Sequence, residues 1–129
     1  MSANLAAGLA AAKILRNLTN LPDNHYAIHR RVAEELGEAG FDVRKFVDVK
    51  YWGGKYNGRI DVVAERDGGT VAIELNNRHL KPRSGPKLRN MDAYRIIASR
   101  GVEFTTMPEG VDENVRLHVD VRVTCDPRR

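Results

Sequence analysis

The chain has 129 residues, of which 42% are hydrophobic and 29% charged, with a formal net charge of +4. This size fits one domain with one core, and the composition excludes an intrinsically disordered chain. The single cysteine, Cys125, excludes an internal disulfide and a cysteine-ligated zinc site. The longest apolar stretch contains Lys13, is too short to span a bilayer and lacks the basic segment of a signal peptide. We therefore expect a cytoplasmic protein, from bacteria or phage-infected cells, with no membrane partner.

The N-terminal stretch, residues 3–19, is rich in alanine and carries leucine and isoleucine at helical spacing. It predicts a helix that packs on a sheet of the same domain, and packing on a second copy, in a homodimer, is the alternative. We assign residues 1–20 to this N-terminal helix, residues 25–124 to the core of a single domain spanning 1–129, and residues 125–129 to a frayed tail.

Residues 25–39 predict a second helix, and one acidic side chain lies close to its apolar stripe. Glu35 follows Ile28 by seven residues, which places it about 20° from that residue around the helix. A glutamate in a buried face is costly without a partner, so Glu35 either has one or lies at the edge of the stripe and reaches solvent. His29 and His25 are further polar candidates on this helix, although a lone histidine is more often structural.

A strand over residues 41–51 and a hairpin over residues 58–77 form the expected centre of the sheet. Gly68 and Gly69 supply the turn, because glycine accepts the positive φ of tight turns. The alternation of the first hairpin strand predicts one face with Ile60, Val62 and Ala64, and the opposite face with Asp61, Val63 and Glu65. In the second hairpin strand it predicts one face with Ile73 and Leu75, and the opposite face with Ala72, Glu74 and Asn76.

The segment after the hairpin is basic, with five cations and no acid between residues 78 and 89. We expect a loop that contacts phosphate there, and a solvated loop is the alternative. A third helix is predicted over residues 86–99 and a short strand over residues 102–106. Residues 115–124 alternate cleanly and predict a strand at the edge of the sheet with one face in solvent.

Two carboxylates, Asp61 and Glu74, are predicted to converge across the hairpin. Opposed residues in an antiparallel pair lie roughly 4.5–5.5 Å apart at Cα. Carboxylates that close repel one another unless a cation or proton lies between them. A hard, oxygen-seeking ion such as Mg²⁺ suits that arrangement, so the pattern predicts a metal site.

The motif formed by Asp61 and Glu74-Leu75-Asn76 resembles that of the PD-(D/E)XK nuclease superfamily, which has the restriction-endonuclease-like fold. The resemblance covers about residues 25–105. It implies an α/β fold with a mixed β-sheet of about four to five strands flanked by helices. The lysine of the family motif is replaced by Asn76, and Lys81 and Lys87 are the candidates for a relocated lysine.

The resemblance implies a metal-dependent endo- or exodeoxyribonuclease that hydrolyses phosphodiester bonds of DNA, including branched or single-stranded DNA. Asp61, Glu74 and the carbonyl of Leu75 would hold Mg²⁺ or Mn²⁺, Asn76 would orient water, and Lys87 or Lys81 would supply positive charge. A helical residue, Glu35 or His29, would support the site. The residues expected to bind nucleic acid are Arg78, Lys81, Arg83, Ser84 and Arg89.

Two alternatives to an enzyme remain open at this point. The loss of the motif lysine at Asn76 favours a nucleic-acid-binding protein with weak or absent chemistry on the same fold. A phage-type structural or assembly protein is the other alternative, in which Asp61 and Glu74 are ordinary surface residues. Carboxylates that lie far apart, or on opposite faces of the sheet, would favour that second alternative.

Overall fold

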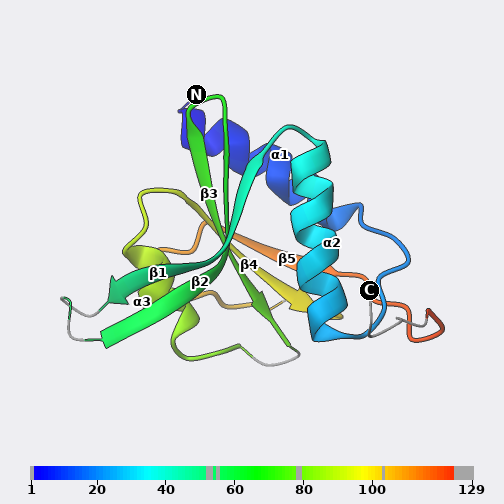
Figure 1. Ribbon diagram of the computed structural model, residues 1–129. Helices are drawn as coiled ribbons and strands as arrows, with labels where there is room; N and C mark the ends of the chain where they lie inside the picture. Colours follow the sequence, from blue (N-terminus) through cyan, green and yellow to red (C-terminus); the bar gives the residue numbers. More distant parts are fainter. Residues whose placement is uncertain (1, 52–53, 55, 78–79, 103, 124–129) are drawn as a thin grey trace.

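The protein is an α/β unit in which a five-stranded mixed sheet is flanked by helices (Figure 1). The computed structural model describes residues 2–51, 54, 56–77, 80–102 and 104–123. Within them none of the helices is long and apolar enough to cross a membrane. The elements in chain order are α1 Ala3–Arg16, α2 His25–Glu38, β1 Asp42–Tyr51, β2 Tyr56–Arg66, β3 Gly69–Asn76, α3 Ser84–Arg89, β4 Tyr94–Arg100 and β5 Glu113–Leu117.

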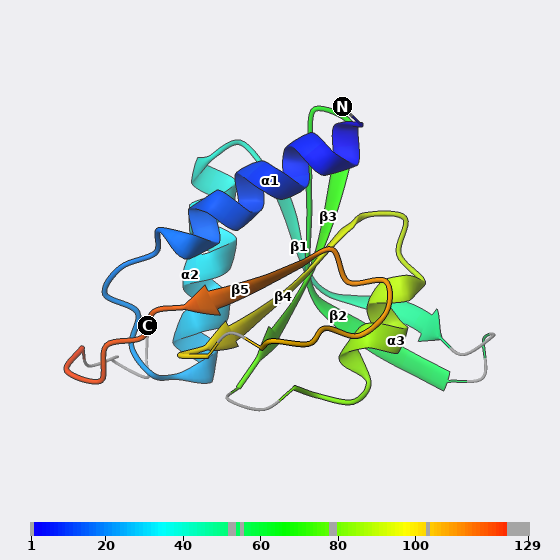
Figure 2. The same ribbon diagram turned by 180° about the vertical axis from the view of Figure 1, so that it is seen from behind.

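The strands lie in the order β1-β2-β3-β4-β5, antiparallel from β1 to β3 and parallel from β3 to β5. The larger core cluster joins α1 and α2 to one side of the sheet. The smaller cluster contains Leu88 of α3 and lies on the other side (Figure 2). The predicted fold class, α/β with a mixed sheet of four to five strands, is therefore confirmed.

Helix α1 packs closely on the sheet because its buried positions are small. Ala7, Ala11 and Ala12 are buried, and Gly8 lies against the ring of Tyr94. A Cβ atom at Gly8 would lie 2.0 Å from Tyr94 Cγ, so only glycine fits there without a shift of the ring or the helix.

The predicted third helix over residues 86–99 is wrong. Helix α3 ends at Arg89, and Tyr94–Arg100 is strand β4, between β3 and β5. Ile96, Ile97 and Ala98 are all fully buried, because a central parallel strand is covered on both faces. Such a strand forms a continuous apolar run, and periodicity alone does not separate a short run of that kind from a buried helix.

The last two predicted strands also differ from the structure. Residues 102 and 104–106 form no strand, and Gly101, with φ at +69°, directs the chain out of β4. The predicted strand over residues 115–124 is shorter, because β5 ends at Leu117 and Val119 makes only an isolated bridge. The Asp120 carboxylate accepts the Arg122 N–H at 3.0 Å, which stabilises a turn there. The edge position of this strand is confirmed.

The faces of the β1–β2 ribbon exchange sides where Phe46 lies opposite Asp61, a position at which the two strands are not paired. Val62 belongs to the α1–α2 side of the sheet, whereas Ile60 belongs to the α3 side together with Val63. The predicted grouping of Ile60 with Val62 is therefore wrong. The alternation slips at Asp61, opposite Phe46, whose φ is +55°. This slip places Asp61 between the two faces, and the candidate site is built around it.

Candidate active site at the divergence of two strands

The hydrogen-bonded ladder between β2 and β3 ends at the pair Val62–Ile73. Beyond that pair, two carboxylates accept the backbone hydrogen bonds between the strands. The Asp61 N–H donates to Glu74 Oε2 at 3.1 Å, and the Leu75 N–H donates to Asp61 Oδ2 at 2.8 Å. Beyond this point the two strands separate: β2 stays paired with β1, and β3 stays paired with β4 (Figure 1). Each carboxylate therefore satisfies a backbone donor of the opposite strand, which fixes both side chains in the gap.

The Glu74 side chain is the most deeply buried of the charged groups at the gap, with 1% of its surface exposed. Its Oε1 atom lies 2.5 Å from Lys87 Nζ and 3.4 Å from the hydroxyl of Ser84. Burial, and next the negative charge of Asp61, raise the pKa of Glu74 from 4.5 to about 7, although Lys87 opposes this effect. At neutral pH the carboxyl group is therefore divided between its protonated and ionised forms.

Lys87 reaches Glu74 from α3 by passing across β2. Its ammonium group also donates to the carbonyl of Arg59 at 2.9 Å, which orients it toward the carboxylates. The side chain passes over Gly58, where a Cβ atom would lie 2.8 Å from Lys87 Cδ and 2.9 Å from Tyr51 Cε1. Gly58 is thus a residue of the site that the sequence analysis missed, because its role depends on a crossing that only the packing of α3 creates.

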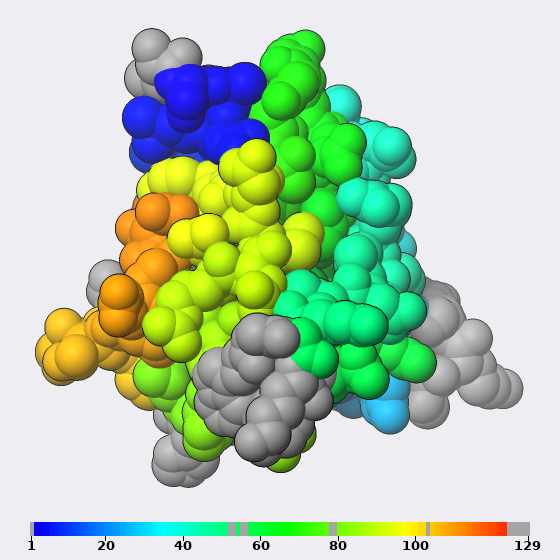
Figure 3. Space-filling model, turned by 90° about the vertical axis from the view of Figure 1, so that its left-hand side faces the viewer, coloured from blue at the N-terminus to red at the C-terminus, as the bar shows by residue number. Residues whose placement is uncertain are grey.

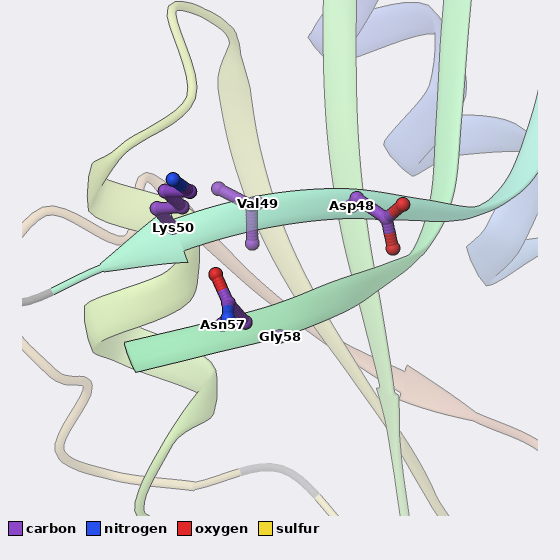
Figure 4. A pocket seen from close by; sticks show the side chains of 5 residues that line it. All are labelled: Asp48, Val49, Lys50, Asn57 and Gly58. Atoms are coloured by element: carbon purple, nitrogen blue, oxygen red, sulfur yellow. The ribbon is translucent and has the colours of Figure 1, made fainter. Parts of the chain in front are cut away.

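A hollow of about 450 Å³ lies beside this crossing (Figure 4). Its walls are formed by residues that face one another across the β1–β2 ribbon. One of them is Gly58, over which the side chain of Lys87 passes. Figure 3 shows the ribbon, teal to green, against the yellow-green α3 on this side of the molecule. The lining residues are Asp48, Val49, Lys50, Asn57 and Gly58.

The other predicted lysine, Lys81, also reaches the gap. Its Nζ atom lies 3.4 Å from the carbonyl oxygen of Leu75. The N–H and C=O groups of a strand residue point to the same side, and the Leu75 N–H bonds to Asp61. The structure therefore brings together the two carboxylates, the Leu75 carbonyl and both candidate lysines.

Asn76 and Ser84 lie behind the carboxylates and are buried, at 2% and 0% exposed. The Ser84 hydroxyl is 3.3 Å from Asn76 Oδ1 as well as 3.4 Å from Glu74 Oε1. Asn76 Nδ2 has no hydrogen-bond partner within the described part of the chain. Ser84 was expected on a surface that binds nucleic acid, and that prediction is wrong because its hydroxyl is enclosed. Asn76 and Glu74 therefore both contact the hydroxyl of Ser84.

Among the described residues, no contact joins Arg83, Arg89 or Glu35 to the gap. Arg78 is outside the described residues, and Arg83 is exposed at the start of α3. Arg89, at the far end of α3, lies 3.8 Å from the Glu109 carboxylate. Glu35 lies at the edge of its helix, with its carboxylate 3.4 Å from Arg31, and points about 120° away from His29 around that helix. The expectation that Glu35 supports the site is therefore wrong. His29 lies close enough to Asp61 for the carboxylate to affect the pKa of the imidazole.

The oxygen atoms at the gap are of the type that binds hard divalent cations. Asp61, Glu74 and the carbonyl of Leu75 are the oxygen donors that Mg²⁺ and Mn²⁺ prefer. Within the described residues no three His, Cys, Asp or Glu side chains cluster closely enough to hold a metal. An ion here would therefore have two carboxylates and one carbonyl as protein ligands, which suits Mg²⁺ because it usually retains several waters.

Comparisons with known proteins give no name to this arrangement. No family model matches the chain, and no curated protein matches it. Among solved structures, the chain is similar to the crystal structure of a protein of unknown function, AF1548, with 21% identity and a TM-score of 0.49. The match covers 77% of this chain and 52% of that protein, so the chain spans about half the length of the protein it matches.

Proposed function

We propose that the protein is a metal-dependent nuclease that hydrolyses phosphodiester bonds of DNA. The observation that carries the proposal is the exchange of carboxylate–backbone hydrogen bonds between Asp61 and the Glu74-Leu75 segment, with Lys87 on Glu74. Two surface residues of a structural protein would not need a gap in the sheet to hold them, so the geometry favours a site over the assembly alternative.

The chain itself supplies three kinds of group for this reaction. Asp61, Glu74 and the Leu75 carbonyl would hold Mg²⁺ or Mn²⁺, which when bound stabilises charge on the phosphate and lowers the pKa of water. Lys87 supplies the positive charge that the residue at position 76 lacks, and its ammonium is held in the gap by the Arg59 carbonyl. Lys81 adds a second cation on the Leu75 side of the gap.

Glu74 also gives the site a group that exchanges a proton near neutral pH. Its pKa of about 7 arises from burial and from Asp61, and Lys87 stabilises the ionised form. Ser84 limits the rotation of the carboxyl group by contacting Oε1, and Asn76 in turn holds Ser84. These supporting contacts keep Glu74 directed into the gap.

Cleavage assays with end-labelled DNA test the proposal directly. Purified protein is incubated with Mg²⁺ or Mn²⁺ and single-stranded, duplex or branched DNA. We expect cleavage that Asp61→Asn abolishes and that Lys87→Met reduces about a hundredfold or more, since removing one charge-stabilising donor costs about 10²–10³ in rate. Glu65→Gln is the matched control, because Glu65 is an exposed carboxylate on the same strand, paired with Arg44.

One result would contradict the proposed nuclease activity. Binding of DNA that weakens steeply with salt, with no cleavage of any of these substrates by either metal, would refute the nuclease. That result would favour a binding protein on the same fold. A calorimetric titration with Mn²⁺ adds a second measurement, in which native protein binds the ion and Asp61→Asn does not.

A further inference from the structure

A second hollow, of about 320 Å³, lies between α2 and β1. It adjoins the gap, because Phe46 stands opposite Asp61 in the β1–β2 ribbon, between the pairs Val47–Ile60 and Lys45–Val62. Aromatic rings make up most of the wall and two cations lie among them. The lining residues are His25, Tyr26, His29, Arg30, Lys45 and Phe46.

The rings form a stacked group that is open on one side. His29 stacks on Phe46 with ring centres 5.5 Å apart and an angle of 21°, and His25 meets His29 edge-on at 4.4 Å. Phe46 is nevertheless 51% exposed, and its φ of +55° is a strained conformation for a bulky residue. An exposed aromatic ring held in a strained backbone beside a candidate active site indicates a binding role.

His29 supplies an independent indication of a ligand. The residue is 5% exposed, and neither of its ring nitrogens has a hydrogen-bond partner in the described part of the chain. Burial lowers the pKa of His29, although Asp61 opposes this, so the ring is neutral near pH 7. A neutral imidazole offers one donor and one acceptor, either of which can pair with a polar atom on the edge of a nucleobase.

We infer that this hollow binds an unpaired nucleobase next to the phosphate held at the Asp61–Glu74 gap, which makes single-stranded DNA, or DNA with unpaired nucleotides, the substrate class. The inference rests on the proposed function for the neighbouring phosphate. Every base has a flat face that stacks on aromatic side chains, so Phe46 would accept any base. A base inside a duplex is covered by its neighbours and cannot enter. Lys45, exposed at the rim, suits the adjoining phosphates.

Fluorescence anisotropy with two probes tests the inference. The probes are a fluorescein-labelled oligothymidylate of about 15 nucleotides and a blunt-ended duplex, both in Ca²⁺ so that no cleavage occurs. We expect Phe46→Ala to weaken binding of the oligothymidylate about tenfold or more, because stacking of one base contributes that much. Binding of the duplex should change less than about twofold, and Phe46→Tyr should retain native affinity for both probes, since tyrosine also stacks.

Two further variants control for structure. Tyr26 is 83% exposed on the rim of the hollow, so Tyr26→Ala removes a ring without disturbing the core and should also weaken oligothymidylate binding. Leu9, 45% exposed on α1, provides the matched control, and Leu9→Ala should bind both probes like native protein. Unchanged oligothymidylate binding in Phe46→Ala and Tyr26→Ala, or equal losses on both probes, would overturn the inference.

A parallel cleavage assay separates this inference from the proposed function. If native protein binds oligothymidylate through Phe46 and cuts no DNA, the nuclease is refuted while the base-binding hollow stands. If native protein cuts DNA and Phe46→Ala cuts single strands with native KM, the hollow is refuted while the nuclease stands.

Discussion

Replacing Glu74 with glutamine is expected to stabilise the protein strongly at pH 8 and only slightly at pH 5. Glutamine resembles the protonated form of Glu74 in shape and charge. In the native structure burial and Asp61 raise the pKa of this carboxyl group to about 7, despite the contact with Lys87. At pH 8 the native protein must therefore hold an ionised carboxylate in a position that favours the neutral group, and the variant avoids that cost.

The sign and size follow from the two pKa values. The unfolded chain releases this proton near pH 4.5 and the folded chain near pH 7, so between them the folded state holds more protons. The free energy of unfolding therefore falls as pH rises through that window. The difference between 4.5 and about 7, at about 1.4 kcal/mol for each pKa unit, corresponds to about 3.4 kcal/mol well above pH 7. Because Glu74 is 1% exposed, solvent screening reduces this value little.

Urea unfolding of both proteins from pH 5 to pH 8, followed by circular dichroism with a chelator present, measures the effect. The difference in unfolding free energy should grow from about 1 kcal/mol or less at pH 5 to about 3 kcal/mol at pH 8. Glu65→Gln, at an exposed carboxylate, should show no such growth. Equal stability of the native protein and Glu74→Gln at pH 8, or a gain that does not change with pH, would refute the reasoning about burial.

Three further predictions concern the candidate site and helix α1. Mn²⁺ at about a hundred times its Kd should raise the native unfolding free energy by about 3 kcal/mol, and a fixed Mn²⁺ concentration should act more strongly at pH 8 than at pH 6, because protons compete for Glu74. Thermal unfolding with and without the ion measures this, and Asp61→Asn should lose it. Gly58→Ala should lower kcat about tenfold in the cleavage assay, since the added methyl group displaces Lys87; native kcat would contradict the crossing. Gly8→Ala should lower the unfolding free energy by about 1–3 kcal/mol in urea, because its Cβ overlaps the Tyr94 ring, and an unchanged value would contradict that packing.

The meeting of Asp61 and Glu74 could be predicted because a short turn fixes register. The turn at Asp67 and Gly68 makes Arg66 pair with Gly69, and counting outward from that pair sets position 61 against position 74. Local turn chemistry and strand alternation therefore located both acids. The count could not reveal that the ladder stops one pair earlier, since that depends on the exchange of faces at Phe46.

The rest of the site depends on packing between distant segments. The sequence of strand β4 resembles that of a buried helix, because burial on both faces removes the alternation that marks a strand. The choice of Lys87 as the partner of Glu74 requires the position of α3 and the space over Gly58, which are tertiary features. The hollow at His29 likewise lies between α2 and Phe46 of β1, which has a left-handed backbone conformation. The sequence gives no sign that these two segments lie against each other.

Asn76 of β3 and Lys87 of α3 approach Glu74 from different elements. A lysine at position 76 would project from β3, two residues from Glu74 on the same face, whereas Lys87 arrives from α3 across β2. The second route makes the ammonium group depend on Gly58 and on the Arg59 carbonyl, so its position is set by the β1–β2 ribbon. In this arrangement a proton, the Lys87 ammonium and a divalent ion would all compete for one buried carboxylate. Because Glu74 titrates near neutral pH, small changes in any of the three would alter which of them it binds.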